Sequence, residues 1–267
     1  MKLLIQGDDY GITKAVTYGI LDAIDNGVLR NTGIFANMPI APWAVEQFKA
    51  KDRSQACLGI DFNIVSGPPV ADPKSVPKLL DNKGEFVRSG IRLQDPLFQT
   101  EEGRREMFPY DEVYREIRAQ YERFVSLVGG KPGYLNVHSL MHENYVEAIR
   151  QLGQEENIPY SMDLQERMGF ASIRNVLSRL IPTTKKAFDP AAQLAKDPLN
   201  DFMTCADVFL AKEYVFFGGH PGFVDAELLG LTTLSLERMR DHEAFTSPKL
   251  LKWIKENGVE LITYNDI

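Results

Sequence analysis

Short apolar runs alternate with amphipathic stretches along the first part of the chain. Runs too short for a helix predict buried strands, and apolar residues at three- and four-residue spacing predict helices. A helix from Thr13 to Asn26, for example, places Val16, Ile20 and Ile24 on one face. The order from the N-terminus is a strand at Leu3–Gly11, this helix, a strand at Thr32–Asn37, a helix at Trp43–Ala50 and a strand at Leu58–Val65. Such alternation is typical of a mostly parallel sheet.

The same alternation returns in the second half of the chain. The pattern predicts helices at Asp111–Leu127 and from His142 to Leu152, and mainly helical structure over 165–212 with a break at Lys185-Lys186. The predicted strands are Tyr134–His138, Ile158–Met162, Tyr214–Gly219 and Val259–Tyr264. With no internal repeat, residues 1–267 are predicted to form a single α/β domain.

Periodicity lapses between Ser66 and Phe108, where Gly, Pro and charged residues dominate. A stretch of this length is too long for an ordinary connection. It still contains Phe86, Ile91 and Leu97, which favour folded structure over disorder. The segment 66–108 is therefore predicted to be a lid or insertion that covers the functional site.

Composition narrows the classes of partner and the compartment. The formal net charge is −7 and no basic cluster stands out, which argues against nucleic acid and anionic membranes as partners. Cys57 and Cys205 lie far apart in apolar surroundings and are predicted to be reduced thiols. Asp8 interrupts any signal-peptide core and no apolar stretch is long enough to span a bilayer, so a cytoplasmic location is expected. A homodimer is left open.

Carboxylates and imidazoles gather at the predicted ends of strands. They are Asp8, Asp9, Asp61, His138, His142 and His220, whereas His242 lies in a charged helical stretch and is predicted to be at the surface. Carboxylates and imidazoles together bind divalent cations and leave a position for water. Asp8-Asp9 could alternatively begin a solvated turn that caps the next helix. Metal-assisted hydrolysis is the leading hypothesis, a metal phosphoesterase and a sugar-binding or regulatory protein being the alternatives.

Several motifs resemble those of the YdjC-like carbohydrate deacetylases. Residues 6–11, Gln-Gly-Asp-Asp-Tyr-Gly, resemble the opening Asn-Ala-Asp-Asp-Phe-Gly of that family. Residues 58–63 and 67–70 resemble its Leu-Gly-Leu-His-Leu-Asn and Gly-x-Pro-Val stretches. Residues 133–142 lie where the family has its His-rich motif, and 219–222 match its His-Pro-Gly. The resemblance extends in order along nearly the whole chain.

The resemblance implies an irregular TIM-like (β/α) barrel that removes acetyl groups from N-acetylated mono-, di- or oligosaccharides. Transferred by position, Asp9 and His138 are metal ligands, Asp8 is the general base and His220 is the general acid. The same motifs make Tyr10, Asn63, Pro221 and Gly222 candidates for substrate binding. For Tyr10, stacking on a sugar is one alternative, and a place in the core is the other.

The chain departs from the family at two motifs. Asp61 stands in place of the histidine of the third-strand motif, and Asn136 and Leu140 replace an aspartate and the middle histidine of the His-rich motif. The remaining His-Ser-x-x-His resembles the motif of broader polysaccharide deacetylases, which makes His142 a candidate ligand. With Asp61 also predicted as a ligand, two carboxylates would favour hard ions such as Mg²⁺ or Mn²⁺ over Zn²⁺. Mg²⁺ is the favoured cofactor, with Mn²⁺ and Zn²⁺ as the alternatives.

Overall fold

A computed structural model describes residues 1–178 and 188–267 of the chain. Its strands are β1 (Lys2–Tyr10), β2 (Asn31–Ile34), β3 (Cys57–Phe62), β4 (Leu135–Val137), β5 (Ala171–Ser172), β6 (Tyr214–Gly219) and β7 (Glu260–Ile262). All strand pairs in the described residues are parallel, in the order β4-β3-β2-β1-β6-β5, with β7 beside β1. The sheet is curled and incompletely closed, as expected for an irregular TIM-like barrel.

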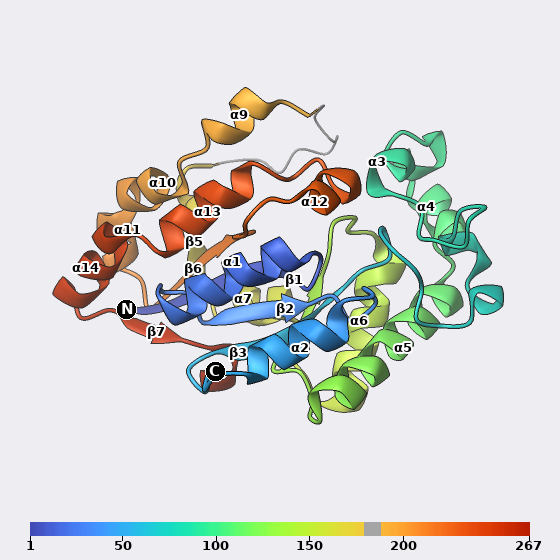
Figure 1. Cartoon of the computed structure of the whole chain (residues 1–267), viewed down its shortest axis with the longest axis horizontal. Coiled ribbons are helices and arrows are strands. Elements are labelled where there is room, and N and C mark those ends of the chain that lie inside the picture. Colours follow the sequence, from blue (N-terminus) through green and yellow to red (C-terminus); the bar gives the residue numbers. More distant parts are fainter. Residues whose placement is uncertain (179–187) are drawn as a thin grey trace.

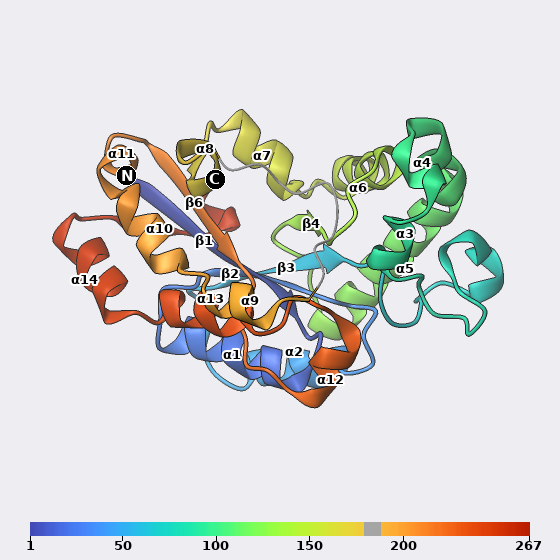
Figure 2. The same ribbon diagram turned by 90° about the horizontal axis from the view of Figure 1, so that it is seen from above.

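Helices follow most strands and cover the sheet on both faces. The longer ones are α1 (Lys14–Asp25), α2 (Ala41–Lys49), α5 (Tyr110–Val128), α6 (Glu143–Glu156), α13 (Glu237–Phe245) and α14 (Pro248–Glu256). Shorter helices are α3 (Ser89–Arg92), α4 (Glu101–Met107), α7 (Ser161–Arg167), α8 (Ile173–Val176), α9 (Pro190–Leu194), α10 (Pro198–Thr204), α11 (Ala206–Leu210) and α12 (Ala226–Leu231). Figures 1 and 2 show α1, α2 and α13 on one side of the sheet and α6 and α7 on the other.

β1 is the central strand, because one of its edges carries two partners in succession. β6 pairs with one edge from Lys2 to Gly7. On the other edge, β7 pairs with residues 2–4, and β2 takes over from Gln6. The buried Asn31 side chain lies at this junction, donates to the carbonyls of Ile5 and Ile262 and accepts from the Tyr264 amide.

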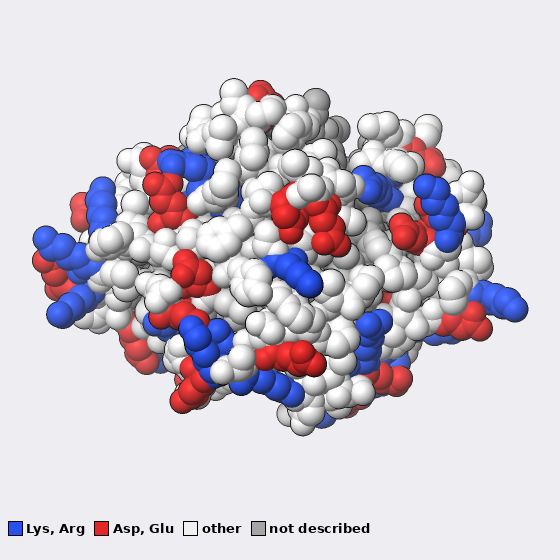
Figure 3. Space-filling view, in the orientation of Figure 1, with Lys and Arg blue, Asp and Glu red and all other residues white. Residues whose placement is uncertain are grey.

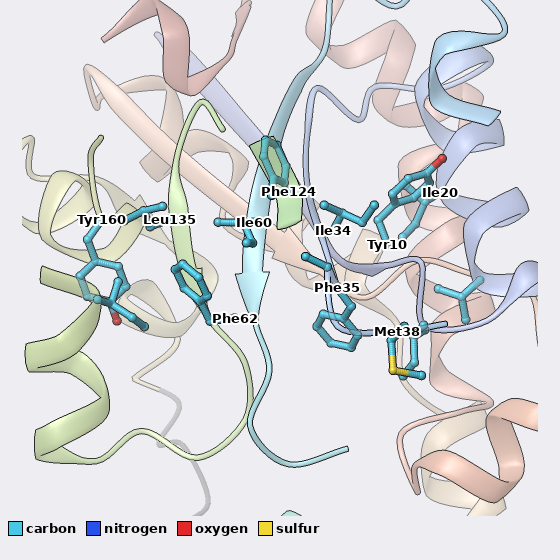
Figure 4. Close-up of a cluster of buried hydrophobic side chains, with 14 of the residues drawn as sticks. Tyr10, Ile20, Ile34, Phe35, Met38, Ile60, Phe62, Phe124, Leu135 and Tyr160 are labelled. Atoms are coloured by element: carbon cyan, nitrogen blue, oxygen red, sulfur yellow. The ribbon is translucent and has the colours of Figure 1, made fainter. Parts of the chain in front are cut away.

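The main core lies between the strands and the helices that follow them. Figure 4 shows part of it, where Ile34, Ile60 and Leu135 from three neighbouring strands are drawn with Phe124 of α5. All four side chains are buried. Their burial accounts for the apolar runs from which the strands were predicted, since both faces of a parallel sheet are covered.

The predicted elements are confirmed for most of the chain, but one predicted strand is wrong and β5 lies inside 165–212, where mainly helical structure is predicted. Strand prediction at Ile158–Met162 is wrong: Tyr160 makes a single bridge to Leu135, and α7 begins at Ser161. The predicted break at Lys185-Lys186 falls outside the described residues. Cys57 and Cys205 are both buried, in keeping with the apolar residues around them in the sequence. No helix in the described residues is long and apolar enough to cross a membrane.

The segment 66–108 is folded but irregular. Its helices α3 and α4 alternate with short 3-10 turns at Pro73–Ser75, Pro77–Leu79 and Pro96–Gln99. The buried Glu116 carboxylate of α5 accepts hydrogen bonds from the amides of Val70 (3.0 Å) and Ala71 (2.9 Å) and thereby anchors the start of the segment. At the other side, Arg88 donates to the carbonyl of Gly230 in α12.

Candidate active site

The Asp8-Asp9 pair ends β1 at an irregularity of the sheet. The pairing of β1 with β2 shifts register between Gly7 and Tyr10, and Asp9 has φ 73°, in the left-handed region that few non-glycine residues adopt. This irregularity relaxes the strict alternation of side chains along a strand. The Asp8 carboxylate contacts Asn136 of β4, and the Asp9 carboxylate contacts His138, which directly follows β4.

Asp9 is held between two basic side chains. The carboxylate is 1% exposed; its Oδ1 lies 2.9 Å from Nδ1 of His138, and its Oδ2 accepts from the guanidinium of Arg238. Burial alone would raise the pKa of Asp9, but the charges of His138 and Arg238 outweigh burial and lower this pKa well below its usual range. Asp9 is therefore ionised across the physiological range.

Asp61 of β3 is bonded to the backbone of Asp9 and to a side chain of β4. Its Oδ2 accepts from the Asp9 amide at 2.9 Å, and its Oδ1 accepts from Nδ2 of Asn136 at 2.9 Å. The carboxylate lies over Gly33 of β2, where an added Cβ would come within 2.0 Å of Oδ1. Burial raises the pKa of Asp61 to about 6, with the Asp9 charge adding to the effect.

Asp8 is half-buried and belongs to the same network. Its Oδ1 accepts from Nε2 of Gln6 at 2.6 Å and from Nδ2 of Asn136 at 3.4 Å, so Asp8 and Asp61 share one amide. Ser161 donates in turn to Oδ1 of Asn136. Burial and the negative charge of Asp61 raise the pKa of Asp8 well above its usual range. A carboxylate of this kind is suited to accept a proton near neutral pH.

His220 follows β6 and faces the same strand ends. Its backbone N–H donates to Oδ2 of Asp241 at 2.9 Å, which fixes the turn. Pro221 packs on Gly7, where an added Cβ would lie 2.8 Å from the proline ring. Burial lowers the pKa of His220, and the Asp9 charge acts in the opposite direction, so the imidazole is within the electrostatic reach of Asp9.

His138 and His142 have different surroundings. His138 follows β4, and its ring contacts the edge of Phe35 as well as Asp9. His142 is the N-cap of α6, where its Nδ1 accepts from the Tyr145 amide at 3.3 Å and its ring stacks on Phe108. Burial lowers the pKa of His142 to about 3, so this ring is neutral. Its Nε2 is buried and has no hydrogen-bond partner among the described residues.

The residues predicted to bind substrate line the protein interior. Tyr10 is 0% exposed, its hydroxyl donates to the Ala44 carbonyl, and its ring lies against Phe48, so the core alternative holds. The fully buried Asn63 side chain holds the turn that follows β3 by accepting from the amides of Val65 and Ser66. Pro221 and Gly222 are buried as well. All four residues therefore lie inside the protein in this structure.

Two buried residues of α13, Arg238 and Asp241, escape the sequence prediction. They lie in a run of charged residues that is typical of a solvated helix face. His242 is predicted to lie at the surface because it belongs to the same run. His242 is in fact partly buried, and its Nε2 lies 2.7 Å from Asp22. A usable signal exists, because Arg238, Asp241 and the buried Phe245 follow the spacing of one helix face.

The donor atoms around Asp9 fit a cation in part. Within residues 1–178 and 188–267, no group of three or more His, Cys, Asp or Glu side chains is arranged to hold a metal ion. Asp9 Oδ1 and His142 Nε2 are nevertheless buried without hydrogen-bond partners in this part of the chain, and His138 Nδ1 lies 2.9 Å from Asp9 Oδ1. Both oxygens of Asp61 are already engaged. Ligation by Asp9, Asp61, His138 and His142 stays a prediction, best supported for Asp9 and His138.

The parallel (β/α) fold places this protein in the class of TIM-like barrels. Carboxylates and imidazoles, the side chains that acid–base chemistry uses, lie at the ends of its strands. Residues 2–256 match the model of the YdjC-like protein family, and the chain belongs to that family.

The chain is also similar to curated and solved relatives over its full length. It is 30% identical to carbohydrate deacetylase 2 of Listeria innocua, over 100% of this chain and 99% of the relative. It is 25% identical to a chitooligosaccharide deacetylase of Proteus mirabilis, over 99% and 98% of the two chains. A crystal structure from Enterococcus faecalis, of a protein provisionally assigned to cellobiose-phosphate cleavage, has a TM-score of 0.74 at 23% identity over 99% and 98% of the chains. That likeness shows a shared fold.

Proposed function

We propose that this protein is a metal-dependent carbohydrate deacetylase that hydrolyses the acetamide of an N-acetylated mono-, di- or oligosaccharide. The observation that carries the proposal is the position of Asp8, Asp9, His138 and His220 at or just after the ends of β1, β4 and β6, with Asp9 between His138 and Arg238. The names of the full-length relatives, carbohydrate deacetylase and chitooligosaccharide deacetylase, support the substrate class.

Each residue of the site has a distinct proposed role. Asp8 accepts the proton of the attacking water, because its raised pKa makes it a stronger base than an ordinary carboxylate. His220 donates a proton to the departing amine nitrogen. Asp9 and His138 hold a divalent cation, for which Mg²⁺ is favoured. When bound, such an ion would polarise the acetamide carbonyl and acidify water. Gln6 and Asn136 orient Asp8 through their amide groups.

Product analysis with a small set of sugars tests the proposal. N,N′-Diacetylchitobiose and its phosphorylated form are incubated with protein and Mg²⁺, Mn²⁺ or Zn²⁺, and acetate and phosphate are both quantified. Acetate release is the expected result. Phosphate release without acetate would instead identify a phosphoesterase, and saturable sugar binding without either product would identify a binding protein. Asp8→Asn should abolish acetate release while sugar binding is retained.

The proposed role of Asp61 as a ligand has its own test. Crystals soaked in Mn²⁺ should show an anomalous peak bonded to Asp9 and His138, with Asp61 ligating directly or through a water. Asp61→His should shift metal preference towards Zn²⁺ and lower the pH optimum, because one anionic ligand is removed. A bound ion with Asp61 still hydrogen-bonded to the Asp9 amide would exclude Asp61 from the ligand set and leave the deacetylase proposal intact.

A further inference from the structure

Helix α13 contacts the ends of two adjacent strands through side chains of one face. Arg238 donates to the Asp9 carboxylate at the end of β1, and Asp241 accepts from the His220 amide, 2.9 Å away, just after β6. Arg238 and Asp241 are three residues apart and therefore lie on one face of the helix. A single helix thus bonds to both the predicted metal carboxylate and the predicted general acid.

Arg238 limits the orientations open to Asp9. Its side chain is 1% exposed, and its Nε donates to the carbonyl of Leu234 at 2.9 Å, which restrains the guanidinium plane. With Oδ2 of Asp9 bonded to Arg238, Oδ1 is the oxygen that faces His138. Asp9 has positive φ, a backbone conformation that is costly for a non-glycine residue and persists only where surrounding contacts stabilise it. The Arg238 contact is one of those that fix the direction of this carboxylate.

The start of α13 is stabilised by a residue from another helix. Its own N-cap position, Leu236, provides no side-chain hydrogen bond. Instead Oε1 of Gln193 in α9 accepts from the amides of Leu236 at 2.8 Å and Ser235 at 3.2 Å. These are N–H groups that a helix start leaves without intrahelical partners. Gln193 therefore acts as an N-cap supplied from α9, which lies beside α13 in Figure 2.

A lysine next to α9 neutralises the buried carboxylate of α13. Nζ of Lys196 lies 2.8 Å from Oδ2 of Asp241 and 3.3 Å from Oε2 of Glu237. Asp241 is only 2% exposed, and an unpaired carboxylate at such a position would be costly. Lys196 thus pairs with the same Asp241 carboxylate that accepts from the His220 amide.

We propose that α13 is a positioning element of the site, in which Arg238 orients Asp9, Asp241 orients His220, and Gln193 holds the helix in register from a distance. Arg238, Asp241 and Gln193 are positioning residues, since they act through Asp9 and His220. The catalytic part of this inference rests on the proposed deacetylase function. Its structural part concerns the order of the His220 turn and can be measured without turnover.

The sharpest variants change Gln193, which lies outside the catalytic constellation. Gln193→Leu removes the acceptor that caps α13, whereas Gln193→Glu keeps an acceptor oxygen. Gln55→Leu is the matched control, because Gln55 is exposed and lies before β3. Gln193→Leu should lower kcat about tenfold with little change in KM, because misplacement of reacting groups reduces rate more than binding. Gln193→Glu and Gln55→Leu should stay near the wild-type kcat.

Backbone hydrogen exchange provides a second readout that needs no substrate. In Gln193→Leu, the peptide containing the His220 amide should exchange faster, while peptides from β2 and β3 should be unchanged. Wild-type kcat together with unchanged exchange at His220 in Gln193→Leu would overturn the proposal. If wild-type protein releases no acetate from any sugar, the proposed deacetylase function is wrong. The exchange rate of the His220 amide in Gln193→Leu still shows whether Gln193 and α13 order the His220 turn.

Arg238 itself is tested by chemical rescue. Arg238→Ala should lower kcat about 100-fold. Added guanidinium at non-denaturing concentration should restore part of the loss by occupying the vacated space, whereas urea should not. Folded Arg238→Ala with full activity would refute the role of Arg238. Should this variant fail to fold, Gln193→Leu carries the test, because its side chain is only partly buried.

Discussion

At the scale of single residues, the site depends on carboxylates whose environments differ although they are close together. Asp9 is paired with His138 and Arg238 and has a lowered pKa, whereas Asp8 and Asp61 share the Asn136 amide and have raised pKa values. Groups with pKa values pushed apart are typical of acid–base sites. The contrast supports different roles for Asp8 and Asp9, which adjacent positions in the sequence do not distinguish.

We expect His220 to be required for turnover more than for metal binding. His220→Ala should lose about 10²- to 10⁴-fold in kcat, the usual effect of removing a general acid, and should retain its metal by elemental analysis. His242→Ala is the matched control, because this imidazole pairs with Asp22. Loss of metal in proportion to activity would make His220 a ligand instead.

The buried His142 should make the metal-free protein sensitive to acid. Burial lowers its folded-state pKa to about 3, while the unfolded-state value is about 6.5, so the folded state binds this proton less well. Its contribution to stability is therefore complete above about pH 6.5 and is lost as the pH falls towards 3. At pH 5 the loss amounts to about 2 kcal/mol.

His142→Asn provides the comparison, since asparagine is a good N-cap and does not titrate. Urea unfolding in EDTA at pH 7.5 and pH 5 should show a larger drop in the free energy of unfolding for wild type than for His142→Asn. Equal drops in the two proteins would contradict the expectation.

At the scale of secondary-structure elements, small residues in one strand leave room for functional side chains of the next. Gly33 of β2 lies under the Asp61 carboxylate of β3, and a Cβ there would come within 2.0 Å of Oδ1. The two residues belong to neighbouring paired strands. A glycine in this strand is thus explained by the carboxylate beside it, a relation that only the sheet register reveals.

Gly33→Ala should therefore destabilise the protein and displace Asp61. Overpacking of this kind costs about 1–3 kcal/mol. The expected result in urea unfolding is a midpoint below that of Gly130→Ala, a control position where an added Cβ meets no described atom within 4 Å. A wild-type midpoint for Gly33→Ala would mean that Asp61 relocates without strain.

The segment 66–108 is the element expected to respond to substrate. It leaves directly after β3, is anchored by Glu116 and reaches α12 through Arg88. Hydrogen exchange with and without product sugar should show protection concentrated in this segment, as expected for a lid. Unchanged exchange across 66–108 would leave it an insertion without a role in binding.

At the scale of the whole molecule, the two ends of the chain meet at β1. The Asn31 side chain bonds to backbone groups of β1 and β7 and to Tyr264, in the interior of the sheet. On the face drawn in Figure 3, acidic and basic side chains are interspersed, in keeping with the absence of a basic cluster in the sequence. The stability of the barrel thus depends on a polar junction inside it as well as on its apolar core.

Asn31→Ala should lower the free energy of unfolding, because the Asn31 side chain bonds the strands at this junction. Alanine removes the side-chain partner of the Tyr264 amide and of the Ile262 carbonyl. An unpaired buried backbone group costs about 1–3 kcal/mol, so the free energy of unfolding should fall by at least that amount. Asn257→Ala, at an exposed C-cap of α14, is the control and should change stability far less. Similar urea midpoints for the two variants would contradict this account.

The sequence by itself determined the order of strands and helices, the single α/β domain and most of the strand-end residues. Apolar runs and helical spacing act locally, and the chemistry of strand ends follows from the parallel sheet they predict. The family motifs then predicted roles for Asp8, Asp9, His138 and His220, which stay predictions. Ile158–Met162 shows the limit, because its short apolar pattern suits a strand as well as the start of α7.

Only the tertiary structure decided which polar groups meet. The pairing of Asp9 with Arg238 joins residues at opposite ends of the chain, and the use of both Asp61 oxygens by Asp9 and Asn136 depends on the register of β3 and β4. A charged stretch such as 237–243 is typical of a solvated helix in sequence, because the charged partners that offset the cost of burying Arg238 and Asp241 come from distant segments. Long-range charge compensation has no local signature, and it determines how this site is organised.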